Sequence, residues 1–112
     1  MVSPRPQRGP APRATLEQLA DHIVYLVATA GIDHVGIGSD FFGGAQPLGL
    51  EHVGRFPDLF AELIRRGLSE SVLAKIASRN FLRAMRAVER TGERLRKERG
   101  PALGRIEDYP GA

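Results

Sequence analysis

The feature that most limits how this chain can fold is one short apolar run, Val35, Gly36 and Ile37, without polar alternation. Such a run is typical of a parallel β-strand that is buried on both faces. We therefore predict a single strand over residues 34–38. The backbone N–H and C=O groups of a lone strand need ladder partners, and this chain offers no second strand to supply them. The sequence thus indicates one part of a larger α/β unit.

The predicted strand leads into a carboxylate, Asp40, and then into a loop over residues 41–55 that contains four glycines. In barrels of parallel strands, catalytic groups lie where the strands run out into the following loops. Asp40 is therefore our candidate for a catalytic and substrate-binding residue. A simpler interpretation also stays open, in which its carboxylate only accepts hydrogen bonds from loop N–H groups.

The first helix is predicted over residues 16–30, where apolar residues recur at helical spacing. Thr15 and Gln18 have the form of a capping box at its start. Gly31 is placed just past its end, where a left-handed backbone costs glycine little.

Further helices are predicted after the loop. Pro57 suits the first turn of a helix that extends to Gly67. Ser69 can cap a short helix, and Asn80 can cap or join the last one. Beyond Gly92 the last helix loses its apolar stripe and should be exposed. Its earlier apolar residues are predicted to face inward: Phe81, Leu82, Met85 and Val88.

Composition divides the chain into three regions. Residues 1–14, rich in proline and arginine, are predicted to be a disordered arm. Residues 15–99 should form the ordered part, and residues 100–112 a flexible tail. No stretch approaches the roughly 18 apolar residues of a membrane span. No apolar segment of signal-peptide type follows the first arginines, so we expect a cytoplasmic protein.

The sequence contains few residues that could bind a metal ion. The chain has no cysteine, which excludes disulfides and thiolate metal sites. His22, His34 and His52 lack the close spacing of a chelating pair, so structural roles are favoured for all three. We therefore predict no metal ligand in the chain.

The basic residues leave a second class of function open. The arm's arginines account for the net charge of +3, and a further basic excess lies over residues 83–99. There the basic residues alternate with glutamates, which is more typical of a solvated helix face than of a phosphate-binding surface. The alternative to an enzyme is a small helical interaction or DNA-binding module without catalysis, in which residues 63–88 resemble a helix-turn-helix. We expect no nucleic-acid partner.

Six short runs follow one another along the chain: DHI at 21–23, AGIDHVGIGSDF at 30–41, GLE at 49–51, FPDL at 56–59, RG at 66–67 and NFLR at 80–83. Taken in this order, they resemble the C-terminal part of the membrane (renal) dipeptidase family of zinc peptidases. The resemblance covers about residues 12–90.

The resemblance implies an α/β fold, as the C-terminal fragment of a (β/α)₈ TIM barrel, with this chain itself mainly α-helical around one short strand. It implies a metallodipeptidase that hydrolyses dipeptides with two zinc ions, whose ligands lie on earlier strands and are absent here. Asp40 matches the family's acid at the end of the last strand. In the family this acid engages the substrate's amino group and is implicated in proton transfer.

The chain also departs from the family. Phe42 stands where the family usually has an aspartate. A barrel of this type needs about 200 residues or more. We therefore expect a truncated open reading frame, a pseudogene product or one part of a split gene, which is inactive alone. The expected partners are a dipeptide substrate and either the missing N-terminal barrel segment or a second copy of this chain.

Overall fold

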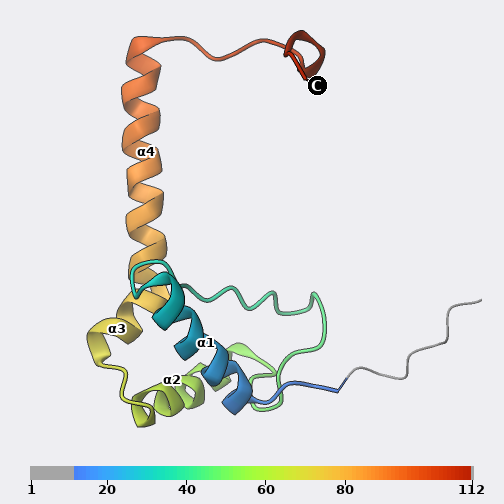
Figure 1. Cartoon of the computed structure of the whole chain (residues 1–112), viewed down its shortest axis with the longest axis vertical. Coiled ribbons are helices and arrows are strands. Elements are labelled where there is room, and N and C mark those ends of the chain that lie inside the picture. The colour runs from blue at the N-terminus through green and yellow to red at the C-terminus, as the bar shows by residue number, and fades with distance from the viewer. Residues whose placement is uncertain (1–11, 112) are drawn as a thin grey trace, which may run out of the picture. The chain divides into compact units, whose positions relative to one another are not determined.

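The computed structural model describes residues 12–111, and these are mainly helical, as predicted (Figure 1). The chain divides after Asn80 into two compact units, each described here by itself. The elements in chain order are α1 (Leu16–Ala30), the 3₁₀ turn η1 (Val53–Arg55), α2 (Phe56–Arg65), α3 (Glu70–Ala74), the π-helical turn η2 (Lys75–Arg79), α4 (Asn80–Glu98) and the 3₁₀ turn η3 (Ile106–Asp108).

The predicted strand over residues 34–38 does not form. Between residues 12 and 111, the β-type pairing is limited to one isolated parallel bridge, which joins Thr15 to Leu48. A β-strand requires hydrogen bonds to a neighbouring strand, and no described segment pairs with residues 34–38 in this way. The prediction of one short strand was therefore wrong.

Residues 35–40 nevertheless alternate between the core and solvent, with the period of two that is typical of an extended chain. Val35 is buried, and Ile37 packs against the core. The intervening side, which we call the open face, consists of Gly36, Gly38 and Asp40, and all three are exposed. Burial on both faces was predicted, but within the described residues only one face is covered.

Helix α1 forms as the sequence predicts. The hydroxyl of Thr15 accepts a hydrogen bond from the Gln18 N–H, and the Gln18 side chain accepts one from the Thr15 N–H. The helix ends at Gly31, whose φ of 91° favours glycine, and whose N–H donates to the Val27 carbonyl. Both helix ends are therefore determined by local sequence.

A Schellman motif ends α2. The Gly67 N–H donates to the Ile64 carbonyl and the Leu68 N–H to the Leu63 carbonyl, while Gly67 has a φ of 93°. The helix begins at Phe56, one residue before Pro57, which still lies in the first turn.

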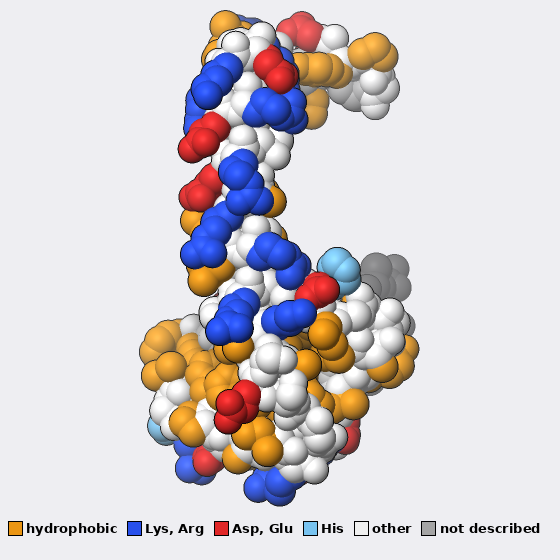
Figure 2. All heavy atoms as spheres, turned by 90° about the vertical axis from the view of Figure 1, so that its left-hand side faces the viewer, with side chains coloured by type: hydrophobic (Ala, Val, Ile, Leu, Met, Phe, Trp, Pro, Cys, Tyr) orange, Lys and Arg blue, Asp and Glu red, His pale blue; other side chains and the backbone are white. Residues whose placement is uncertain are grey.

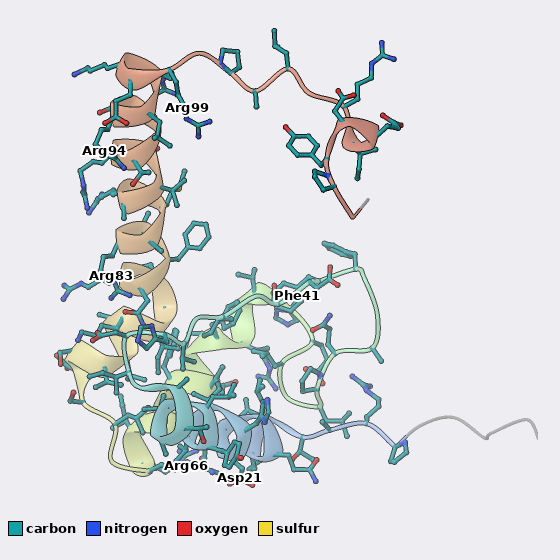
Figure 3. All side chains as sticks on the ribbon, turned by 45° about the horizontal axis from the view of Figure 1, so that its top comes forward. Asp21, Phe41, Arg66, Arg83, Arg94 and Arg99 are labelled. Carbon is teal, nitrogen blue, oxygen red and sulfur yellow. The ribbon has the colours of Figure 1, made fainter. Side chains whose placement is uncertain are left out.

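Arg66 joins α2 to α1. Its guanidinium pairs with the Asp21 carboxylate and donates to the Glu17 carbonyl at 3.0 Å, both on α1 (Figure 3). Its Nε also pairs with Glu62 at 3.0 Å. The carboxylates of Asp21 and then Glu62 raise the pKa of Arg66. This arginine fixes the crossing of the two helices at their exposed edge.

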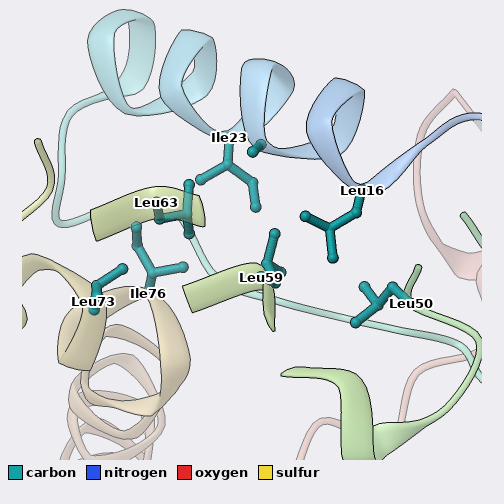
Figure 4. Packing of buried hydrophobic residues seen from close by; sticks show 8 residues of the cluster. Leu16, Ile23, Leu50, Leu59, Leu63, Leu73 and Ile76 are labelled. Atoms are coloured by element: carbon teal, nitrogen blue, oxygen red, sulfur yellow. The ribbon is translucent and has the colours of Figure 1, made fainter. Parts of the chain in front are cut away.

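The core of the first unit lies between α1, α2 and the α3–η2 region (Figure 4). Leu59 and Leu63 project from α2, and Ile76 from η2; all three are fully buried. The rest of the buried cluster comprises Leu16, Ala20, Ile23, Leu50 and Leu73. A core this small makes the stability of the unit sensitive to each member.

The last helices follow one another without a break. The Ser69 hydroxyl accepts a hydrogen bond from the Val72 N–H and caps α3, as predicted. The α3 helix passes directly into η2, and η2 passes directly into α4 at Asn80. Of the two alternatives predicted for Asn80, the structure therefore shows that it joins the helix.

In the second unit, α4 carries exposed side chains of two kinds. Lys and Arg side chains follow its length (Figure 2). The four apolar residues that were predicted to face inward are instead 39% to 71% exposed, because nothing within their own unit covers them: Phe81, Leu82, Met85 and Val88. Most of the predicted arm, residues 1–11, lies outside the described residues. The predicted tail contains the turn η3.

The size of the core predicts a clear difference between two residues of α2. Leu59→Ala should lower the free energy of unfolding by about 2–5 kcal/mol, because it opens a cavity at a fully buried position. Ile64→Ala is the matched control, since Ile64 is 53% exposed and its loss should change the free energy by at most about 0.5 kcal/mol. Urea unfolding followed by circular dichroism measures both, and equal losses would contradict this account of the core.

The pairing of Glu62 predicts a loss of stability in acid. Hydrogen bonds from Arg65, and then from Arg66, hold the pKa of the Glu62 carboxyl below its ordinary value of 4.5. Because the folded state has the lower pKa, the ionised carboxylate stabilises the fold above pH 4.5, and this stabilisation is lost as the pH falls through the folded pKa.

Thermal unfolding of the wild type and of Glu62→Gln tests this dependence. At pH 7 the variant should melt at a lower temperature than the wild type. The difference should shrink steadily below pH 4.5. A difference that is independent of pH would mean that the charge of Glu62 does not stabilise the fold.

Candidate functional site

Asp40 lies at the end of the extended segment, where the chain turns into the glycine-rich loop. Its φ is 48°, and that of Phe42 is 71°; these are the two non-glycine residues with positive φ among residues 12–111. Aspartate tolerates this region better than most residues, whereas a bulky aromatic rarely adopts it. The backbone strain of the described chain is thus concentrated beside the candidate acid.

The backbone of Asp40 is fixed by two hydrogen bonds to its carbonyl oxygen. The Gly43 N–H donates to it at 2.9 Å and Gln46 Nε2 at 3.2 Å. The carbonyl of Gln46 in turn accepts from Nε and Nη2 of Arg13 at 3.1 and 2.6 Å. Gln46 therefore links the turn at Asp40 to the residues that precede α1.

The carboxylate of Asp40 folds over Gly43. A Cβ atom placed on Gly43 would lie 2.6 Å from Cγ and from both carboxylate oxygens of Asp40. A Cβ on Gly44 would meet nothing within 4 Å. The carboxylate can therefore occupy this position only because residue 43 has no side chain.

Two neighbouring aromatic residues have opposite environments. The Phe41 ring packs edge-to-face on Phe56 at 5.8 Å between centroids, and Phe56 stacks on Phe60 at 6.3 Å (Figure 3). The side chain of Phe42 is fully exposed. Phe41 thus anchors the start of the loop, while Phe42 presents an apolar surface where the resemblance leads one to expect a carboxylate.

Two apolar grooves adjoin the extended segment and share Ile37 and Ser39. One, of about 250 Å³, lies between residues 35–39 and α1 and is completed by Leu59 and by loop residues 46, 47 and 50. The other, of about 370 Å³, is completed by aromatic residues of α2 and by Ala77. Apart from His22 of α1, neither groove has an ionisable side chain in its lining. The grooves therefore suit apolar packing more than catalysis.

The three histidines lie apart from Asp40 in the sequence and have different surroundings. His22 is on α1, and His34 follows the turn at Gly31. His52 caps η1, with its Nδ1 accepting from the Gly54 N–H at 3.2 Å. Throughout residues 12–111, no three His, Asp or Glu side chains gather as a metal site would require.

Glu51, in one of the runs that resemble the family, closes a local turn. Its Oε1 accepts the Gly49 N–H at 2.9 Å, and this hydrogen bond is the largest cause that lowers the pKa of the carboxyl. The second cause is the N–H of Glu51 itself. The geometry gives this glutamate a role in loop structure.

Comparison with known proteins identifies the family. Residues 6–99 match the family described as membrane dipeptidase, peptidase family M19. This chain belongs to that family. None of the helices that the structure describes is both long and apolar enough to cross a membrane.

Curated relatives carry the name dipeptidase. Dipeptidase ataJ of Aspergillus terreus is 51% identical over 85 residues, which cover 75% of this chain and 21% of that protein. An uncharacterized dipeptidase of Schizosaccharomyces pombe is 39% identical over 110 residues, which are 96% of this chain and 25% of the relative. Dipeptidase verJ of Clonostachys rogersoniana is 41% identical over 90 residues, 80% of this chain and 23% of that protein. The chain thus spans about a quarter or less of the length of each relative, which is consistent with a fragment.

The sequence predicted Asp40 as a candidate residue, but it did not predict the residues that contact it. Gly43 had a weak signal, since it belongs to a glycine pair that follows the acid. Gln46 had none, because its contact with the Asp40 carbonyl depends on how the loop closes.

The contact between Asp40 and Gly43 predicts opposite results for two adjacent glycines. Gly43→Ala should displace the Asp40 carboxylate, because the new methyl group would overlap it. Gly44→Ala should leave it in place. The Hα–Hβ coupling constants of Asp40 report its χ1 rotamer, and an equal change in both variants, or in neither, would contradict the described geometry.

Proposed function

We propose that this chain supplies the C-terminal part of a metallodipeptidase barrel, which hydrolyses the peptide bond of a dipeptide. The observation that carries the proposal is the open face of residues 35–40. There Asp40 and two glycines are exposed, while Val35 is buried and Ile37 packs against the core. In a barrel wrapped by helices, the side away from the helices faces the interior, and a strand-end acid borders the active site.

In this proposal Asp40 binds the free amino group of the dipeptide. A carboxylate and an ammonium group form a strong, charge-assisted hydrogen bond. The Asp40 carboxylate is exposed, and no ion pair engages it among the described residues, so it is available to a substrate. The same oxygen atoms can hold a proton and return it to the leaving amine.

The family is the only support for zinc in this proposal. Two ions are expected from the family, with their ligands on the earlier strands of the barrel. The isolated chain is accordingly proposed to be inactive. The cytoplasmic location stays a prediction from the sequence.

We propose the missing N-terminal barrel segment as the partner of this chain. Its neighbouring strands would supply the ladder that residues 34–38 lack, and the two apolar grooves beside Ile37 offer surface for them. Residues 12–111 of a second copy of this chain would offer no formed strand for that purpose. The DNA-binding alternative is not proposed, because the family match covers most of the chain.

A chimera tests the role of Asp40. The segment of Aspergillus terreus dipeptidase ataJ that aligns with this chain is replaced by the corresponding residues of this chain. The chimera should hydrolyse dipeptides, and Asp40→Asn should lower kcat/KM by about 100-fold or more, because the amide neither pairs as an anion nor exchanges the proton. Asp58→Asn, at an exposed position in the first turn of α2, is the matched control and should retain most of the activity.

The isolated chain is the second arm of this experiment. It should bind no stoichiometric zinc and hydrolyse no dipeptide. A chimera that is inactive although it is folded and metal-loaded, or an Asp40→Asn chimera with full activity, would refute the proposed function. Zinc-dependent hydrolysis by the isolated chain would refute the proposal that it needs a partner.

A further inference from the structure

Asn80 is a buried polar residue whose function the dipeptidase reaction does not explain. Its side chain is 5% exposed, and it is the buried polar residue of the described core. The amide Nδ2 donates to the Ile32 carbonyl at 2.7 Å and to the Val35 carbonyl at 2.9 Å. A primary amide has two N–H donors, and here each has a different backbone acceptor.

These two hydrogen bonds hold the turn that precedes the extended segment. Ile32 lies within the turn, and Val35 is the first residue of the segment that ends at Asp40. Because Val35 is buried, its carbonyl has little access to water and depends on a protein donor. Asn80 therefore fixes the position at which the extended segment begins.

The π-helical turn η2 places Asn80 for this task. It directly precedes Asn80, and its Ile76 is fully buried and anchors it in the core. The carbonyl oxygen of Ile76 lies 4.0 Å from where a Cβ of Gly36 would be. Lys75, also in η2, pairs with Asp33 at 2.8 Å. Such π turns occur often beside functional sites.

We propose that Asn80 is a positioning residue for Asp40. It clamps the turn at residues 31–35 to the π turn and so sets the path of the segment whose last residue is the acid. The catalytic part of this inference rests on the proposed function of Asp40, whereas the clamp itself can be tested on this chain alone.

The first test measures backbone order in the full chain. Asn80→Leu and Asn80→Asp keep the size of the side chain and remove both donors. In each, the ¹⁵N order parameters of residues 36–40 should fall below about 0.6, while those of α1 stay near about 0.85. Ser78→Ala, at an exposed position of η2, is the matched control and should change neither.

Two results would overturn the clamp. One is an unchanged order parameter at residues 36–40 in both variants. The other is an equal loss of order in α1, because it would show that Asn80 supports the whole fold and not this segment.

The second test measures whether Asn80 acts through Asp40. In the ataJ chimera, Asn80→Leu should lower kcat/KM at least tenfold. In a chimera that already carries Asp40→Asn, the same substitution should change kcat/KM less than twofold, because the group that Asn80 positions is gone. Metal content should be the same in all variants.

Additive losses in the two chimeras would refute the positioning role. If the unsubstituted chimera is inactive, the proposed function is refuted. The order parameters of the free chain still test whether Asn80 orders residues 36–40.

Discussion

The rest of this structure depends on one constraint, which is that the backbone of residues 35–40 must be satisfied without a β-ladder. The chain meets this need at the two ends of the segment. The Asn80 side chain donates a hydrogen bond to the Val35 carbonyl, and the Gly43 N–H of the loop donates one to the Asp40 carbonyl. Between these ends, the apolar side chains pack on the helices and the glycines remain exposed. A helical subdomain can therefore carry an extended segment that has strand-like alternation but no strand partner.

Local sequence signals predicted the helices well. Thr15 with Gln18, Ser69 and Gly67 each act through hydrogen bonds or dihedral angles within a few residues, so the sequence contains all that is needed to recognise them. The strand failed because a ladder depends on segments that are distant in sequence. The inward orientation predicted for residues 81–88 of α4 failed for the same reason, since amphipathic spacing shows that a face needs cover but not what covers it.

The candidate site shows the same division. Asp40 could be found from its place after an apolar run and from the ordered runs that resemble the family. The hydrogen bonds from Asn80 to the start of its segment could not be predicted. Asn80 lies 48 and 45 residues from Ile32 and Val35, and it contacts their backbone carbonyls, which leave no trace in residue type.

The π turn has a consequence for how this helix can change in evolution. A π turn holds one residue more than an α-helical path of the same direction, and each residue of an α-helix adds about 100° of rotation. Deleting the extra residue would return this stretch to an α-helical path, whereas a further residue inserted with α-helical geometry would turn the face of every later position by that angle. Asn80 would leave its two carbonyls even though no amino acid at the contact had been replaced. The length of this stretch is therefore under stronger constraint than the identity of its exposed residues.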